Sequence, residues 1–270
     1  MNSTTRKLLI LIAVLILLLA GVLGARFFLA PQGPAESPAP TASADTTAEP
    51  TEDPYAALPT RWSREEYAKN EAINSDYVFT LRFESGLIDL PVVQGSSNDS
   101  YLRVDWESGK YTEEGTTFLD FRNVIGEDHN LIVYGHYVYR ELDPSQTRMF
   151  TPLHQLADED NYEKNRYVDL LLEDKIQRYE VADVYYCQLI YDEAEKAYLY
   201  TYDDMQYFLT NYTAEYLPIY RRAIDLFRFY DTGVTWDEND QILTLQTCVE
   251  NHEELRLIVI AKLVEEVPLP

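Results

Sequence analysis

The hydrophobic and polar residues divide the chain into three stretches of different character. Residues 8–25 are uncharged and mostly aliphatic, and as a helix they would measure about 27 Å, close to the hydrocarbon thickness of a bilayer. Residues 31–59 are rich in Pro, Ala, Thr and acidic side chains and bury too little apolar surface to fold alone. From residue 60 onward, short apolar runs alternate with turn residues. We therefore expect a cytoplasmic stub and membrane anchor over 1–30, an extended spacer over 31–59 and one folded domain over 60–270.

The charges beside residues 8–25 predict the orientation of the anchor. Arg6 and Lys7 precede the apolar run, and no acidic residue occurs before Glu36. The positive-inside rule then places the N-terminus in the cytoplasm and the folded domain outside the cell. A cleaved signal peptide would share the basic start, but the run is long for one and Leu23 fits the −3 position of a cleavage site poorly. We expect an uncleaved, single-pass anchor in the cell membrane.

Short β-like runs fill most of the folded domain. Many are bounded by turn residues such as Ser85-Gly86 and Gly95-Ser96. The runs are residues 78–83, 87–93, 117–120, 131–134, 167–172, 178–186, 242–246 and 255–263. Eight short strands in one domain predict a mostly-β barrel or sandwich.

Two segments have a helical period instead. Residues 62–73 form a short helical pattern, and Ser63 followed by Glu66 is typical of a capping box. Residues 203–229 carry apolar and aromatic side chains at helical spacing, with Pro218 expected to start or kink a helix. We predict an N-terminal helix before the first strand and a helical insert between the sixth and seventh strands, whose aromatic residues pack against the β-structure.

Composition excludes several classes of function. The chain has 22 Lys and Arg against 46 Asp and Glu, a formal net charge of −24, so binding to nucleic acid is not expected. Its two cysteines cannot form a disulfide scaffold. The sequence contains no nucleotide-binding loop, no HExxH and no CxxC, and no histidine pair has metal-ligand spacing. We expect neither a metal nor a cofactor.

The two cysteines differ in their surroundings. Cys187 lies in an apolar run and is predicted to be an inert core thiol. Cys248 ends a strand-like run, and Arg256 follows eight residues later at the start of the next strand. Two antiparallel strands joined by that loop would bring Cys248 and Arg256 together, and a guanidinium near a thiol favours the thiolate and can hold an oxyanion. The alternatives are a disulfide with Cys187 or a buried free thiol.

A nucleophilic thiol needs a base, and His136 is the strongest candidate among four histidines. It follows an apolar strand-like run and Gly135, a residue that permits a sharp turn. His129, His154 and His252 lie among polar residues and are predicted to be surface histidines, with His252 a weaker competitor for the base because it lies close to Cys248.

Together these motifs resemble the sortases, and class B sortases in particular. The family's TLxTC motif followed by an Arg matches residues 244–248 with Arg256, and its strand ending before the catalytic histidine matches residues 134–136. The class B stretches ID-x-PVVQ and YL…GKY…GT-F-D-RN match residues 88–94 and 101–123. The resemblance spans residues 62–264 and implies an eight-stranded sortase-type barrel with an N-terminal helix and a helix between strands six and seven.

The resemblance implies a cysteine transpeptidase. Cys248 would attack a backbone carbonyl of a sorting-signal peptide and form a thioacyl intermediate, and His136 would act as general acid and base. Arg256 would hold the substrate carbonyl and the oxyanion, with Thr247 as a helper. Class B enzymes often have Ser where this chain has Gln246, which leaves substrate specificity open. In some members an acidic residue shortly after the cysteine is proposed to assist the reaction, and Glu250 is the nearest match.

The implied partners are a sorting-signal peptide of exported surface proteins and an amine acceptor, with the membrane contacted through residues 8–25. The acceptor would be a peptidoglycan precursor in a protein that anchors surface proteins to a Gram-positive cell wall. A pilin lysine in a pilin-polymerising enzyme is the first alternative. A membrane-tethered binding module with a sortase-like barrel and no catalysis is the second, although such a module would not need His136, Cys248 and Arg256 together.

Overall fold

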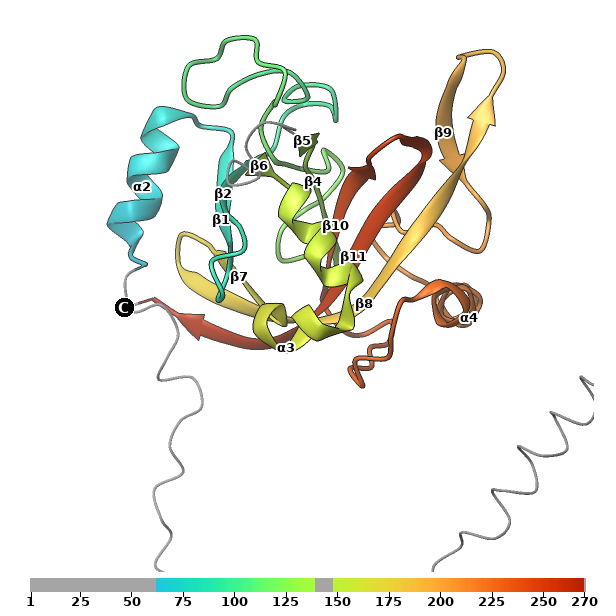
Figure 1. The fold of residues 1–270 in the computed structure, drawn as a ribbon. Coiled ribbons are helices and arrows are strands. Elements are labelled where there is room, and N and C mark those ends of the chain that lie inside the picture. The colour runs from blue at the N-terminus through green and yellow to red at the C-terminus, as the bar shows by residue number, and fades with distance from the viewer. Residues whose placement is uncertain (1–61, 139–147, 270) are drawn as a thin grey trace, which may run out of the picture. The chain divides into compact units, whose positions relative to one another are not determined.

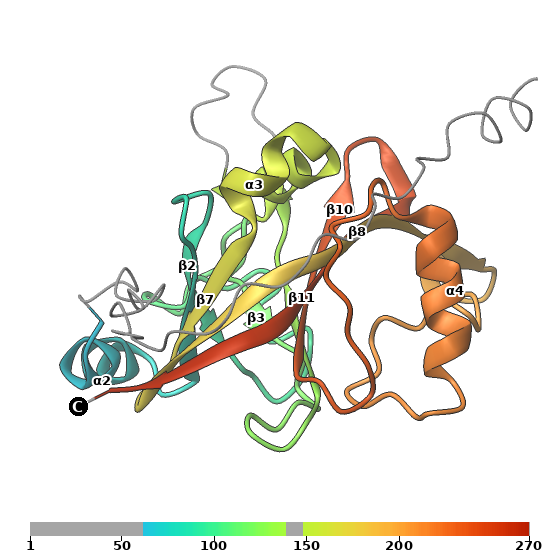
Figure 2. The same cartoon turned by 90° about the horizontal axis from the view of Figure 1, so that it is seen from below.

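The fold is a closed β-barrel of eight strands, described by a computed structural model for residues 62–138 and 148–269. The strands are ordered β11-β10-β4-β3-β2-β1-β7-β8, and pairing between β8 and β11 closes the barrel. Their bounds are β1 Tyr77–Phe83, β2 Asp89–Val93, β3 Phe118–Leu119, β4 Asn130–Tyr134, β7 Tyr167–Leu171, β8 Lys175–Asp192, β10 Ile242–Val249 and β11 His252–Pro268. Figures 1 and 2 show β8 and β11 as the two longest arrows, crossing the barrel side by side.

Each of the eight predicted runs contains a strand of this barrel. The largest difference in length is in β8, which extends past the barrel and pairs through Leu189–Asp192 with β9, Ala197–Thr201. This hairpin projects from the barrel at the upper right of Figure 1. The sequence analysis did not predict β9, nor the short pair β5, Tyr137–Val138, and β6, Arg148–Met149.

Several helical segments accompany the strands of the barrel. The predicted N-terminal helix is α2, Arg64–Ile73, and Ser63 caps it by accepting a hydrogen bond from the Glu66 amide at 3.3 Å. After β6 the chain forms η2, Thr151–Ala157, η3, Glu159–Asn161, and α3, Tyr162–Asn165. None of these three short turns was predicted, because they lack the length that makes a helical period visible.

The insert between the sixth and seventh barrel strands contains a helix, but only in its second half. α4 spans Leu217–Phe227, with Pro218 in its first turn, where a missing N–H costs nothing. Residues 203–216 form turns and bends, so the predicted helical structure over 203–229 was wrong for this part. α4 packs beside β8 through buried Tyr220 and Ile224 (Figure 2).

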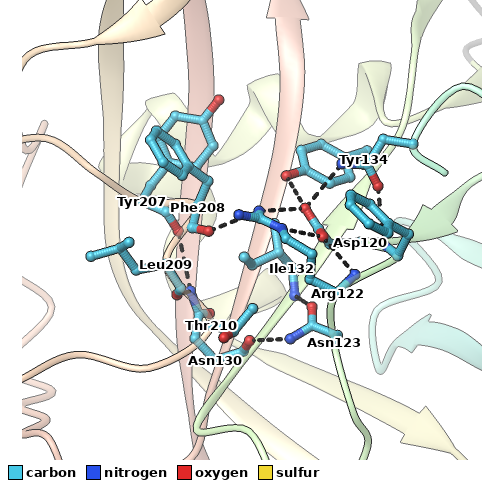
Figure 3. A network of polar contacts seen from close by, with 12 residues as sticks. Asp120, Arg122, Asn123, Asn130, Ile132, Tyr134, Tyr207, Phe208, Leu209 and Thr210 are labelled. Atoms are coloured by element: carbon cyan, nitrogen blue, oxygen red, sulfur yellow. Dashed lines mark hydrogen bonds and ion pairs between the residues drawn. The ribbon is translucent and has the colours of Figure 1, made fainter.

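Long-range hydrogen bonds explain why residues 203–216 are not helical. The side-chain amide of Asn130 donates to the carbonyls of Tyr207 and Leu209 at 3.1 and 2.8 Å. Arg122 donates to the carbonyl of Phe208 at 3.0 Å, and the Asn130 backbone amide donates to Thr210 at 2.9 Å (Figure 3). Four successive carbonyls that a helix would use internally are thereby taken by other parts of the chain.

The two largest of four apolar clusters among the described residues form most of the core. One occupies the barrel interior, and its members include Leu243, Leu245 and Leu257. The other lies under α4, where the Tyr212 ring stacks on Tyr220 at 5.2 Å and packs against Trp236 at 5.7 Å. The buried aromatic residues of the insert are therefore core residues, as predicted.

The predicted anchor and spacer, residues 1–30 and 31–59, lie outside the described residues. No helix among residues 62–138 and 148–269 has both the length and the apolar character needed to span a bilayer.

Candidate active site

Cys248, Arg256 and Cys187 lie in one row across three neighbouring strands. Cys248 on β10 is paired with Arg256 on β11, and Arg256 is paired in turn with Cys187 on β8. Directly paired residues share a face of the sheet, so Arg256 lies between the two thiols. The predicted proximity of Cys248 and Arg256 is confirmed.

The same row excludes a disulfide between the two cysteines. Two strand spacings separate their backbones by about 10 Å, beyond the roughly 7 Å that a disulfide tolerates, and both thiols are free. Cys187 is fully buried, which raises the pKa of its thiol to about 12, whereas Cys248 is partly exposed. Cys187 is a core thiol, and Cys248 is the thiol open to a substrate.

This difference predicts how the protein reacts with thiol reagents. Under native conditions we expect one equivalent of an alkylating reagent to be taken up at Cys248, and a second at Cys187 only after unfolding, because a buried protonated thiol is neither accessible nor nucleophilic. Peptide mapping by mass spectrometry measures both. Rapid native labelling of Cys187, or a native bridge between Cys187 and Cys248, would contradict the assignment.

The guanidinium of Arg256 is held by its own strand. Its Nη1 donates to the carbonyls of Leu255 and Glu253 at 2.8 and 2.9 Å. Within the described part of the chain, Nε and Nη2 of Arg256 donate no hydrogen bond. These two donors remain for a substrate oxygen or an oxyanion beside Cys248.

His136 follows β4 and is half-buried. Its Nε2 lies 2.8 Å from the carbonyl of Leu102, and because a carbonyl only accepts, Nε2 carries the proton and Nδ1 remains as the acceptor. Burial lowers the pKa of His136 more than the Leu102 carbonyl raises it, which favours a neutral imidazole at neutral pH. Gly135 has no positive φ; its role is close packing, since a Cβ there would lie 2.5 Å from the Phe150 ring.

Cys248, His136 and Arg256 line one cavity of about 300 Å³. Its floor includes Gln246 and Cys248, on the face of β10 opposite the barrel-interior residue Leu245, and the β8–β9 hairpin and the turns before α4 contribute Leu189, Tyr198 and Tyr207. The remaining lining residues are Asn98, Leu102, Phe118, Tyr134 and Gly135. A second cavity of about 550 Å³ reaches Cys248 and Arg256 from the loop between β10 and β11, beside Lys196 and Glu253. Cys248 and Arg256 therefore line both cavities.

The sequence analysis gave Gln246, Thr247 and Glu250 supporting roles in catalysis or substrate binding, and only Gln246 lines the first cavity. The side-chain oxygen of Gln246 accepts a hydrogen bond there from the Tyr207 hydroxyl at 3.1 Å. Thr247 is fully buried, on the opposite face of β10 from Cys248, so its hydroxyl cannot reach a substrate in the cavity. Glu250 is exposed and accepts a hydrogen bond from the Tyr137 hydroxyl at 3.2 Å, away from the first cavity.

A buried carboxylate that the sequence analysis did not single out supports the cavity wall. Asp120 has no exposed surface and accepts hydrogen bonds from Arg122 Nε and Nη2, both at 2.8 Å, from Tyr134 at 2.8 Å and from Asn98 at 3.0 Å (Figure 3). Tyr134 and Asn98 line the cavity directly, and Arg122 holds the turn that carries Tyr207. The sequence signal was an Asp two residues before an Arg at the end of a strand.

Asp120→Asn should weaken the fold by about 2–3 kcal/mol at neutral pH, because the buried carboxylate that pairs with the partly exposed Arg122 loses its charge. Burial alone would raise the pKa of Asp120, but the hydrogen bonds from Arg122, Asn98 and Tyr134 outweigh it and lower that pKa. The stabilisation is therefore present above about pH 4, the pKa of this carboxyl in the unfolded chain. It is lost as the pH falls through the lower pKa that Asp120 has in the folded protein. Urea unfolding at pH 7 and pH 3 measures this.

The control for that substitution is Asp99→Asn, at an exposed carboxylate nearby, for which a change within about 0.5 kcal/mol is expected. An equal loss in both variants, or a loss at Asp120 that does not shrink at low pH, would contradict the role given to Asp120.

The other histidines divide into two kinds. His129 and His252 bind the Glu238 carbonyl and the Glu254 carboxylate, and His252 is exposed. His154 was predicted to be a surface residue, and this was wrong: it is half-buried, and its Nε2 lies 3.0 Å from the carbonyl of Cys248. The buried neighbours Leu153 and Leu156 were the overlooked signal, and the contact itself forms only when η2 lies against the end of β10.

Several known proteins are similar to this chain in sequence and in structure. The sortase domain family matches residues 82–264. Sortase B of Staphylococcus aureus (strain NCTC 8325 / PS 47) is 27% identical over 208 residues, which cover 75% of this chain and 76% of that protein. The crystal structure of Clostridium perfringens sortase B is 28% identical, with a TM-score of 0.59 over 73% of this chain and 99% of the other.

Structures of S. aureus sortase B with a substrate and of sortase B with triglycine each have a TM-score of 0.58. They are 23% and 24% identical to this chain, covering 76% and 75% of it and 87% and 86% of their own chains. At that identity they support the shared fold.

Proposed function

Because this chain belongs to the sortase family of cysteine transpeptidases, we propose that it cleaves a C-terminal sorting signal of exported proteins and transfers the acyl part to an amine. The observation that carries the proposal is the pairing of Cys248 with Arg256 on one face of the sheet, in a cavity that also contains His136. A thiol, a base and an oxyanion donor in one cavity are the groups that acyl transfer requires.

The first half of the reaction forms a thioester. The Cys248 sulfur attacks the peptide carbonyl while its proton passes to His136, whose neutral imidazole accepts it at Nδ1. Arg256 donates to the carbonyl oxygen as negative charge develops there. The imidazolium then gives the proton to the leaving amine, the C–N bond breaks and the thioacyl enzyme remains.

The second half returns the enzyme to its starting state. His136 takes a proton from the incoming amine, whose nitrogen attacks the thioester carbonyl, and the Cys248 sulfur leaves and is reprotonated. The second cavity at Cys248 supports this order, because an amine can approach while the acyl chain still occupies the first cavity. The sortase B complexes with a substrate and with triglycine support a peptide donor and an amine acceptor.

We place the enzyme in the cell membrane, with the N-terminus cytoplasmic and the catalytic domain outside, on the basis of the apolar residues 8–25 and the basic residues before them. Protease treatment of intact cells should degrade an epitope at the C-terminus and spare one at the N-terminus. Protection of both epitopes would contradict this placement.

The acceptor separates the two remaining roles. A cell-wall anchoring enzyme uses an amine of a peptidoglycan precursor, and a pilin-polymerising enzyme uses a lysine side chain of another protein. The net charge of −24 favours a cationic acceptor of either kind. The presence of all three catalytic groups argues against a binding module without catalysis.

The test uses the full chain in detergent, a panel of fluorogenic sorting-signal peptides and two acceptors, triglycine and a lysine-containing peptide. Cleavage with formation of the triglycine product supports the anchoring role, and preference for the lysine side chain supports the pilin role. If no peptide in the panel is cleaved with either acceptor, the proposed function is wrong.

A further inference from the structure

The carbonyl of Cys248 lies just beyond the end of the strand that pairs with β10. On the β4 side, the carbonyl of Gln246 accepts the amide hydrogen of Gly135 at 3.1 Å. Carbonyls alternate along a strand, so the next one on that side belongs to Cys248. β4 ends at Tyr134, and His154 supplies the donor instead, with Nε2 3.0 Å from the Cys248 oxygen.

Two tyrosine rings pack against the His154 ring. The ring of Tyr137, adjacent to His136, packs edge-on against it at 5.0 Å, and the Tyr186 ring lies at 6.4 Å. The Tyr137 hydroxyl donates to Glu250, two residues after Cys248. His154 therefore connects the segment that carries the base to the strand end that carries the nucleophile.

His154 is not a second base. It does not line either cavity at Cys248, and its Nε2 faces a backbone carbonyl. Burial lowers its pKa, more than the Cys248 carbonyl and Glu250 raise it, so the ring is neutral at pH 7 and the contact fixes the Nε2–H tautomer. Between Cys248 and Val249 the register of β10 with β11 shifts, and Val249 pairs with His252, so the contact from His154 lies at an irregular point of the ladder.

We propose that His154 is a positioning residue, whose Nε2–H fixes the peptide plane of Cys248 and so the direction of the thiol relative to His136. This inference rests on the proposed function. Without that donor, the Cys248 carbonyl turns toward water and the thiol moves with it. Small misplacements of reacting groups reduce the chemical step far more than substrate binding.

The test compares His154→Phe, which keeps a ring for Tyr137 and removes the donor, with His154→Gln, whose amide N–H is the same number of bonds from the backbone. In the folded full chain we expect His154→Phe to lower kcat about 10-fold with KM changed less than about 2-fold. His154→Gln should restore kcat to within about 2-fold of wild type. Gln155→Ala, at an exposed neighbour on η2, is the control and should leave kcat unchanged.

Two kinetic outcomes would overturn the proposal: an unchanged kcat in folded His154→Phe, or equal losses in the Phe and Gln variants, which would indicate a packing role only. If His154→Phe does not fold, His154→Leu serves as the donor-less variant. The alkylation rate of Cys248 keeps this test independent of the proposed function. Even if no peptide is cleaved, that rate should fall about 3-fold in the Phe variant and recover in the Gln variant, and equal rates in all forms would refute the role of His154.

Discussion

Cys248→Ala is expected to reduce peptide cleavage by at least about 1,000-fold and to abolish the thioacyl intermediate. No other accessible thiol can replace it, because Cys187 is fully buried and burial raises its pKa to about 12. Cys248 is partly exposed, so the free energy of unfolding should change by less than about 1 kcal/mol. Initial rates with a fluorogenic peptide, together with urea unfolding, separate the two effects.

The matched control is Cys187→Ala. It should lower the free energy of unfolding by about 1–2 kcal/mol, since a buried sulfur is removed from packed surroundings, and the folded protein should keep its cleavage rate within about 2-fold. Loss of activity in folded Cys187→Ala, or substantial activity in Cys248→Ala, would reverse the roles assigned to the two thiols.

Arg256→Lys is expected to lower kcat about 100-fold or more, although the charge is kept. The guanidinium uses Nη1 to bind the carbonyls of Leu255 and Glu253 and has Nε and Nη2 left for the substrate oxygen. A lysine ammonium cannot do both in the same geometry, and losing one oxyanion donor costs about 100- to 1,000-fold. Steady-state kinetics of the purified variant measure the loss.

Arg222→Lys is the control for that substitution, because Arg222 is exposed on α4, outside both cavities at Cys248. Its kinetics should match the wild type. If Arg256→Lys also keeps wild-type kcat, Arg256 supplies only a positive charge and the oxyanion role is wrong.

The barrel could be predicted from sequence because its strands are marked locally. Each of the eight predicted runs has the apolar side chains that fill the interior, and Pro218 marks the start of α4. The eight-residue spacing between Cys248 and Arg256 predicted their pairing, since a short loop between antiparallel strands leaves few other registers.

The remaining features depend on contacts between distant residues, which periodicity does not record. Residues 203–216 have a helical pattern but give their carbonyls to Arg122 and Asn130, about 80 residues away in sequence. Asp120 ends a strand-like run and was not singled out, and His154 was assigned to the surface. Only folding shows that Asp120 collects four hydrogen-bonding side-chain groups and that His154 meets the Cys248 carbonyl.

The most direct test of the central claim is to trap the covalent intermediate. The full chain is incubated with a sorting-signal peptide in the absence of amine, quenched in acid and mapped by mass spectrometry. We predict an acyl adduct on the peptide containing Cys248, removed when triglycine or a lysine peptide is added before quenching. An adduct on Cys187, or no adduct with any peptide that the protein cleaves, would contradict catalysis by Cys248.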